Sequence, residues 1–375
     1  MAGDAAGAAT DHALEALVAQ VREARARKAS LQIVGGNTKH FLGGIPQGEP
    51  LDVGPLAGIS SHEPSELVVT VRAGTPLAEL EALLAQQGQC LPFEPPRFAT
   101  DAGTGGTVGG MVAAGLAGPA RAAAGGVRDY VLGATLLDGR GELLSFGGQV
   151  MKNVAGYDVS RLLAGAMGVL GVICEVSLKV LPRPPATLTL RLELDEAQAL
   201  RRLNEWGGRP LPLNASAWWE GTLVVRLAGA AAAVQSARAA IGGEVIDAAM
   251  ADPFWDGLRD QRDEFFVGAL KAVAAGAGLW RLSVPSTAPP LKLSGEQLIE
   301  WGGAQRWLCT TAPAQTLRDA AAAVGGHATL FRAHRREDGG RPAPLAPPLA
   351  RIHRELKRAF DPDGLFNRGR LYPEW

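Results

Sequence analysis

The chain has 375 residues, which is more than a single domain usually contains and enough for two domains with separate hydrophobic cores. Its 37 Lys and Arg residues are balanced by 38 Asp and Glu residues, and the formal charge of −1 gives no electrostatic footprint for nucleic acid or anionic lipid. The 3 cysteines lie far apart, which excludes a disulfide scaffold, a zinc ribbon and a self-contained iron–sulfur cluster.

Neither the N-terminus nor the longest uncharged segment predicts a secreted or membrane-spanning protein. Residues 1–10 contain Asp4 and no basic residue, unlike a secretory signal. We therefore expect a cytoplasmic protein, with peripheral attachment at the inner face of the plasma membrane as the alternative. Residues 102–120 are uncharged and long enough to cross a bilayer, but their many glycines favour a loop, so no transmembrane segment is expected.

The first half of the chain alternates predicted helices with strands. Apolar residues at helical spacing predict an amphipathic helix over residues 12–29, and the leucines after Thr75-Pro76 predict a second helix that ends at Gly88. Short apolar or alternating runs predict strands over residues 31–34, 67–72 and 172–180 and a hairpin over residues 131–146. The Leu-Pro-Arg-Pro-Pro run at 181–185 predicts a domain boundary, because proline ends a strand.

Beyond that boundary the pattern changes to two rounds of strands and helices. The first round has strands over residues 188–194, 214–219 and 223–228 and near 244, with helices over residues 196–206 and 230–240. The second, less regular round has strands over residues 279–284, 306–310 and 327–333 and a helix over residues 313–323. Each round resembles a βαββαβ unit, which predicts an α+β domain with one antiparallel sheet. A Gly/Pro linker and a final amphipathic helix follow.

Two glycine-rich segments are candidates for phosphate binding, because converging backbone amides hold a phosphate and glycine permits the close approach. They run from Val34 to Gly44 and from Gly103 to Gly115, and each alone is also compatible with a tight turn packed on a strand. The Rossmann fingerprint fails at the second segment, where Val108 replaces the last glycine. There is no Walker A sequence, and the 6 histidines lack metal-binding spacing, so we expect no metal site.

Five separated segments occur in the order typical of one flavoprotein family. They are GGNTK, VRAGTPLAELEALLAQQGQCLPFEPP, GGTVGGMVAAGLAGP, GVRDYVLGATLLDGRGELL and KNVAGYDVSRLLAGAMGVLGVICEVSLKVLPRP. Together they resemble the FAD-binding domain of the vanillyl-alcohol-oxidase type, also called the PCMH-type fold. The ending FDPDGLFNRGRL resembles the segment with which that family returns to the flavin. Residues 150–158 and the short second domain are most similar to the FAD-binding subunits of bacterial glycolate oxidases.

The resemblance implies an α+β fold in three parts. Residues 1–185 would form a two-lobed PCMH-type FAD-binding domain, and residues 186–340 a smaller α+β cap domain whose antiparallel sheet consists of ferredoxin-like units. Residues 341–375 would be a C-terminal segment that returns to the FAD domain. The implied cofactor is FAD, bound non-covalently, because His40 does not directly follow the glycine pair as the histidine of covalent relatives does.

The family's cofactor contacts carry over to three stretches and one C-terminal residue. The pyrophosphate loop corresponds to Gly35, Gly36, Asn37, Thr38 and Lys39. The second pyrophosphate and ribityl contact corresponds to Thr107, Val108, Gly109, Gly110 and Gly115. The turn at the adenine end or diphosphate corresponds to Gly168, Gly171, Val172 and Ile173, and the polar residue near the ring to Asn367. Relatives often carry Ser-Glu where this chain has Ala166-Met167, so one polar flavin contact is missing.

The catalytic residues stay unassigned at this level. Catalytic 2-hydroxy-acid dehydrogenases of the family carry a histidine-rich HxGDGNxH segment, which this chain lacks. Oxidising a 2-hydroxy acid needs a base for the hydroxyl proton and a cation for the carboxylate. The candidates are scattered along the chain: Lys152, Tyr157, His327, Arg332, His334 and Arg335.

The resemblance therefore implies an FAD-binding subunit of a glycolate oxidase complex. Such a subunit would act on a small hydroxy acid, oxidising glycolate to glyoxylate, together with a second FAD-containing catalytic subunit and an iron–sulfur subunit. Two alternatives stay open. One is a self-sufficient FAD-dependent dehydrogenase of a 2-hydroxy acid, alcohol or aldonolactone, and the other is a structural subunit with a vestigial flavin fold.

Overall fold

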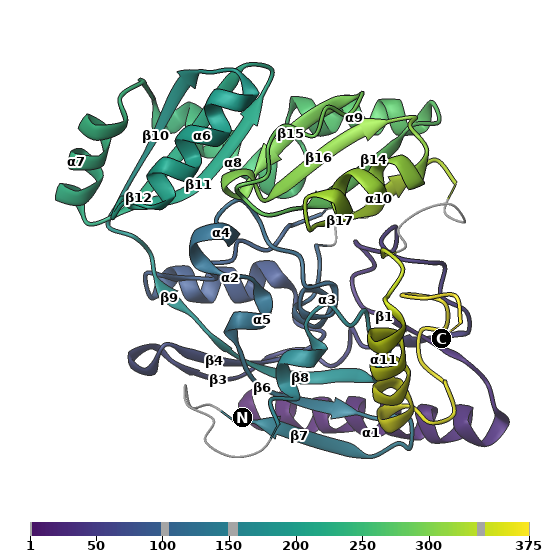
Figure 1. The fold of residues 1–375 in the computed structure, drawn as a ribbon. Helices are drawn as coiled ribbons and strands as arrows, with labels where there is room; N and C mark the ends of the chain where they lie inside the picture. The colour runs from purple at the N-terminus through teal and green to yellow at the C-terminus, as the bar shows by residue number, and fades with distance from the viewer. Residues whose placement is uncertain (1, 99–104, 149–156, 336–341, 375) are drawn as a thin grey trace.

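Two large antiparallel sheets organise the chain (Figure 1). The computed structural model describes residues 2–98, 105–148, 157–335 and 342–374. Residues 59–179 build one sheet and residues 186–333 build the other, and helices pack on both, so the predicted α+β class is confirmed. Within the described ranges, no helix is both long and apolar enough to cross a membrane.

The N-terminal lobe, residues 2–182, contains a five-stranded sheet in the order β3-β4-β8-β6-β7. Its strands are β3 (Ile59–Glu63), β4 (Val68–Arg72), β6 (Val131–Leu137), β7 (Leu143–Gly147) and β8 (Val172–Lys179). The helices of this part are α2 (Leu77–Gln86), α3 (Val108–Ala114), α4 (Arg121–Ala124) and α5 (Val127–Tyr130). Helix α2 repeats leucine at helical spacing, and its buried Leu77, Leu80 and Leu84 enter the core beneath the sheet.

A small parallel pair, β1 (Leu31–Val34) and β2 (Glu49–Asp52), forms a second core with the long helix α1 (Ala2–Arg27). Leu17 and Val21 of α1 pack there against Leu31 and Leu51. The same core receives Phe366 from the C-terminal segment. Helix α1, the β1–β2 pair and the C-terminal segment therefore share one core, and β1 ends beside it at Val34.

Residues 186–333 form the cap sheet, with eight antiparallel strands in the order β13-β10-β12-β11-β15-β16-β14-β17. The strands are β10 (Ala186–Glu193), β11 (Leu213–Trp219), β12 (Thr222–Gly229), β13 (Glu244–Ile246), β14 (Gly278–Ser283), β15 (Glu296–Glu300), β16 (Gln305–Thr310) and β17 (His327–Ala333). Helices α6 (Glu196–Gly207), α7 (Ala231–Ile241) and α10 (Ala314–Ala323) pack on one face. Helices α8 (Ala248–Asp260) and α9 (Glu264–Ala274) pack on the other face, together with Phe98 and Leu116 of the N-terminal lobe.

The cap contains the one antiparallel sheet that the sequence predicts, but it includes a strand, β15, that was not predicted. Strand β15 pairs with both β11 and β16 and so joins the two rounds into one sheet. No helix separates β14 from β15, whose connecting residues 284–295 are all described. The sequence pattern did not predict helices α8 and α9. Pro253 interrupts the helical pattern of α8, and no predicted strand marks where α9 begins.

The C-terminal segment returns to the N-terminal lobe after helix α11 (Pro347–Phe360). The Leu31 amide donates to the Leu365 carbonyl at 2.7 Å, and the Asn367 amide donates to the Leu31 carbonyl at 2.9 Å. Leu365 and Phe366 are fully buried in the core around β1. Residues 365–367 thus extend the small parallel pair through an isolated bridge between Leu31 and Phe366.

A buried ion pair shapes the turn that follows α11. Lys357 Nζ donates to Asp361 Oδ2 at 2.5 Å and to the Val169 carbonyl at 2.6 Å. The Asp361 carboxylate also accepts the amides of Leu365 and Phe366, each at 2.8 Å. Because the charges and the carboxylate oxygens all have partners, these interactions offset the desolvation penalty of burying the pair.

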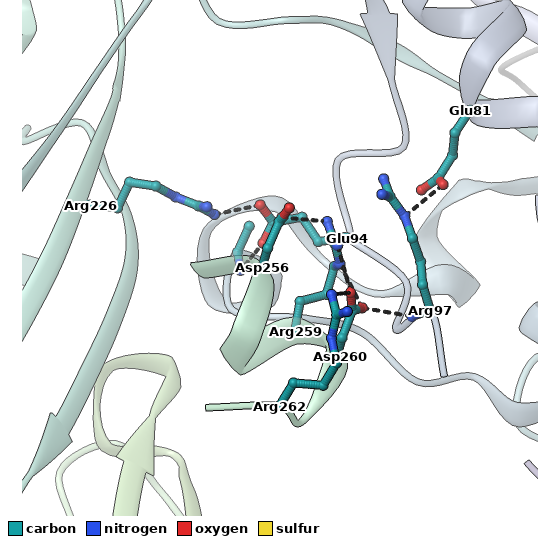
Figure 2. Close-up of polar contacts among 9 residues, drawn as sticks. Glu81, Glu94, Arg97, Arg226, Asp256, Arg259, Asp260 and Arg262 are labelled. Carbon is teal, nitrogen blue, oxygen red and sulfur yellow. Dashed lines mark hydrogen bonds and ion pairs between the residues drawn. The ribbon is translucent and has the colours of Figure 1, made fainter. Parts of the chain in front are cut away.

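Charged residues join the cap sheet to the N-terminal lobe (Figure 2). Arg226 of β12 donates to Glu94 at 2.5 Å, and Asp260 at the end of α8 accepts the backbone amide of Arg97 at 2.8 Å. Arg259 and Arg262 also donate to Asp260. Although burial opposes ionisation, the hydrogen bonds from Arg259 and from the Arg97 amide hold the pKa of Asp260 below its ordinary value.

We predict that Asp361→Asn destabilises the protein by about 3–5 kcal/mol, because it leaves the Lys357 charge buried without an anion. Urea unfolding followed by circular dichroism measures the change. The matched control is Glu355→Gln on the same helix, whose ion pair with Arg358 is solvent-exposed and contributes less than about 1 kcal/mol. Equal unfolding free energies for the two variants would contradict the structural role of the buried pair.

Candidate functional site

A cleft opens at the carboxyl end of β1, between the N-terminus of α3 and the C-terminal segment. It holds about 840 Å³ of empty space, open solvent at its mouth included, which is in the range of small-ligand sites. Twelve of the predicted cofactor residues line it: Gly35, Gly36, Asn37, Thr38, Lys39, Thr107, Gly109, Gly110, Gly168, Gly171, Ile173 and Asn367. Residues as far apart in the sequence as Gly35 and Asn367 therefore meet in one cavity wall.

The two glycine-rich segments lie against each other rather than in separate nests. A Cβ atom on Gly36 would lie 2.5 Å from the Gly105 carbonyl oxygen, and one on Gly35 would lie 2.7 Å from Thr107 Oγ1. Only glycine fits so close a backbone contact. Among the described residues, no protein acceptor receives the backbone amides of residues 35–38. Within that part of the chain, these N–H groups are available to a phosphate bound at the cleft.

Helix α3 begins at the floor of the cleft, with Thr107 as its N-cap accepting the Gly110 amide at 3.2 Å. A Cβ atom on Gly109 would lie 2.6 Å from Ala73 Cβ, so this glycine permits the helix to pack on the end of β4. A Cβ atom on Gly110 would meet only Thr107 Oγ1, at 3.2 Å. A side chain at Gly110 would therefore extend into the cleft without clashing with Ala73 or the neighbouring strand.

Three residues that the resemblance assigned to the cofactor lie away from the cleft. Val108 and Val172 are fully buried in the two cores of the N-terminal lobe. Gly115 ends α3 in a left-handed conformation and packs against Gly165. A helix and a strand turn neighbouring residues to different sides, so a contiguous motif cannot face one ligand along its whole length.

The C-terminal segment forms the wall opposite α3. Asn367 accepts the Ile33 amide at 2.8 Å and donates to the Met167 carbonyl at 2.7 Å. A Cβ atom on Gly168 would lie 2.6 Å from Asn367 Nδ2, so that glycine, at φ 73°, makes room for the amide. Asn367 therefore holds two walls of the cleft together through its side chain.

Arg370 is a cleft residue that the sequence did not reveal. Its guanidinium donates to the carbonyl oxygens of Lys39 and His40, each at 2.9 Å, and to that of Gly44 at 3.2 Å. These bonds fix the path of the loop that follows β1. The only sequence signal was the proximity of Arg370 to Asn367, because the contact joins residues 331 positions apart.

Lys39 places a cation inside the cleft. Its side chain is buried, its Nζ lies 3.3 Å from Thr38 Oγ1 and 5.7 Å from the centroid of Phe98, and no described carboxylate forms an ion pair with it. Burial lowers the pKa of Lys39 to about 8, while the more distant charge of Asp260 acts in the opposite direction. A bound anion would supply the missing partner.

The candidate bases do not gather around this cleft. Tyr157 is 94% exposed, His327 lies on the edge strand β17, and Arg332 stacks on Phe41 at 3.5 Å. Neither His334 nor Arg335 lines the cleft. Lys152 and the rest of residues 149–156 lie outside the described residues. Within the described ranges, no group of three His, Cys, Asp or Glu side chains could hold a metal ion.

The cleft fits FAD by its chemistry. The free amides of residues 35–38 and the Lys39 ammonium would hold the diphosphate, and the glycines would leave room for it. Ala73, Ala113 and Met167 give the remaining surface the apolar character that a flat ring system needs.

Comparisons with known proteins agree with this fit. A family profile described as "FAD binding domain" matches residues 7–147. Glycolate oxidase subunit GlcE of Escherichia coli (strain K12) is 48% identical over 96% of this chain and 97% of that protein. Glycolate oxidase subunit GlcD of Bacillus subtilis (strain 168) is 31% identical over 33% of this chain and 25% of its own length. A solved alkyldihydroxyacetonephosphate synthase shares the fold, with a TM-score of 0.63 at 14% identity, covering 94% of this chain and 74% of that one.

The fold and the cleft define an FAD-binding oxidoreductase with the PCMH-type domain, as the sequence resemblance implied. The near full-length similarity is more specific. The chain belongs to the family of the glycolate oxidase subunit GlcE.

We predict that Gly110→Val weakens FAD binding by about tenfold or more, because its side chain overpacks the cleft without disturbing Ala73. Visible flavin absorbance after gel filtration reports the retained cofactor. Gly268→Val is the control, since this glycine also lies in a helix with room for a Cβ and far from the cleft. Full flavin retention by Gly110→Val would remove the α3 N-terminus from the site.

We also predict that FAD affinity is constant up to about pH 8 and then falls by at most about tenfold per pH unit. The sign follows because only protonated Lys39 attracts the diphosphate, and the lysine loses its proton above that pH in the free protein. Lys39→Met should bind FAD more weakly and lose this pH dependence, whereas Lys271→Met, on the exposed side of α9, should keep it. Quenching of FAD fluorescence gives the affinities. A parent profile that stays flat up to pH 10 would exclude Lys39 from the diphosphate site.

Proposed function

We propose that this chain is the FAD-carrying subunit of a cytoplasmic glycolate oxidase complex that oxidises glycolate to glyoxylate. The observation that carries the proposal is the 48% identity to GlcE over almost the whole chain, in a protein whose glycine-lined cleft suits FAD. We assign residues 1–185 to the FAD-binding domain, residues 186–340 to the cap domain and residues 341–375 to the returning segment. The cofactor would be held non-covalently by the residues that line the cleft.

The partners we propose are a second FAD-containing catalytic subunit and an iron–sulfur subunit. The local similarity to GlcD supports this, because a protein named as another glycolate oxidase subunit shares part of the same sequence. Peripheral attachment to the inner face of the membrane is compatible with the absence of a spanning helix from the described ranges.

The chemistry favours a chain that works within a complex. Converting glycolate to glyoxylate removes a hydride from carbon and a proton from the hydroxyl, and bound FAD supplies the two-electron acceptor. The proton requires a positioned base. Among the described residues, His40 is the histidine that lines the FAD cleft, no carboxylate lines it, and His327 borders only the cavity beside it, so we assign proton removal to the partner subunit rather than to this chain.

The test compares the chain purified alone with the chain co-expressed with both partners. We expect the lone chain to be yellow, to release its flavin on acid precipitation and to show little glycolate-dependent dye reduction, whereas the complex is fully active. A lone chain as active as the complex would establish the self-sufficient dehydrogenase. A colourless chain in an active complex would establish the vestigial subunit.

A further inference from the structure

A second cavity, the cap cavity, lies beside the FAD cleft on the side of the cap sheet. The two cavities share Ala114 and Met167 in their walls. The cap sheet contributes Arg281 from β14 and both His327 and Thr329 from β17, the edge strand that faces the N-terminal lobe in Figure 1. A ligand in the cap cavity would therefore contact both the cap sheet and the end of the FAD cleft.

Arg281 brings an unpaired guanidinium to this cavity. On β14 it lies between Trp307 of β16 and Thr329 of β17, on the face of the cap sheet that packs on the N-terminal lobe. Its only described contact is with the ring of Phe331, at 5.9 Å from the centroid. No described carboxylate forms an ion pair with it and no described acceptor receives its N–H groups. Arg281 is partly buried, and a partly desolvated cation in this state costs free energy unless a ligand neutralises it.

Two of the charged side chains near Arg281, Arg332 and Arg121, are also cations. The Arg332 guanidinium lies 5.8 Å from the centroid of the same Phe331 ring. Burial, and then the charge of Arg121, lower the pKa of Arg281 to about 10. Glu300 borders a small cavity on the other side of Arg281, but its carboxylate accepts Trp307 Nε1 at 2.7 Å and Gln305 Nε2 at 3.1 Å. The positive charge is thus left for an anion from outside the chain.

Arg281 is better placed than Arg332 to bind such an anion. Arg332 stacks on Phe41 at 3.5 Å and donates to Gln261 at 3.3 Å, so its planar faces and one of its donors are occupied. The donors of Arg281 are available as a fork, the geometry that matches a carboxylate. The other walls are mostly apolar, with Leu42, Leu116 and Met167, and would exclude a second charged group.

We propose that Arg281 binds the carboxylate of a small 2-hydroxy acid in the cap cavity, so that this chain has its own substrate-anion subsite beside FAD. The inference rests on the proposed function, because glycolate is the anion that the complex would supply. It assigns carboxylate recognition to this chain and leaves proton removal with the partner.

The test titrates the FAD-loaded full-length chain with glycolate, by calorimetry and by the change in the visible flavin spectrum. Glycolamide, the neutral analogue, is titrated in parallel. We expect glycolate to bind, glycolamide to bind weakly, and Arg281→Met to weaken glycolate binding by about 10- to 100-fold at unchanged FAD content. Arg318→Met is the matched control, because that guanidinium also lies 5.9 Å from an aromatic centroid but packs on Trp280, on the opposite face of the sheet.

Arg281→Lys is the second variant, for the case that Arg281→Met does not fold. It keeps the positive charge and loses only the paired N–H donors of the guanidinium. Weaker glycolate binding in either Arg281 variant that retains its FAD supports the subsite. Parent-like glycolate affinity in every Arg281 variant that retains its FAD would overturn it. A parent chain that holds FAD but does not respond to glycolate, while the complex oxidises glycolate, would overturn the subsite and leave the proposed function intact. A parent chain without FAD would instead defeat the proposed function.

Discussion

The buried pair of Lys357 and Asp361 fixes the part of the chain on which the cleft depends. Lys357 ties the end of α11 to the Val169 carbonyl, and Asp361 holds the amides of Leu365 and Phe366. The residues that follow are then positioned to close the site: Asn367 bridges β1 to the 167–168 turn, and Arg370 holds the loop after β1. A pair of charges far from the glycine motifs thus determines the shape of the space that those motifs line.

Both uncharged backbone amides and a charged side chain are available in the cleft to bind an anion. Free backbone amides border it without adding net charge, which is compatible with a chain whose formal charge is −1. Lys39 adds one desolvated cation, whose pKa falls to about 8 because burial outweighs the attraction of Asp260. Arg281 is in the same state in the adjoining cap cavity. Both cations gain stability only when an anion arrives, which couples ligand binding to the stability of the fold.

The contact between the lobes fixes how the two neighbouring cavities lie relative to each other. Glu94 and Arg97 of the N-terminal lobe are held by Arg226 and Asp260 of the cap (Figure 2). Phe98 of the N-terminal lobe adds an apolar contact, because it packs in one core with residues of the cap. Partly buried charge pairs specify one relative orientation, since a shifted interface would leave charges without partners. The cap sheet can therefore present β14 and β17 to the FAD cleft in a defined geometry.

The amino-acid sequence by itself determined the fold class, the cofactor and the family, because these depend on local motifs: the Gly35-Gly36 turn after β1, the Thr107 cap of α3 and the turn after α11. It did not determine which residues of each motif face the ligand. Val108 and Val172 turn into cores while Gly110 faces the cleft, and this depends on how α3 and β8 pack. Arg370 and Arg281 acquire their places only from tertiary contacts, Arg370 with a loop 331 positions away and Arg281 with a cavity between two lobes. Such contacts leave no local pattern in the sequence, because the folded chain alone brings their partners together.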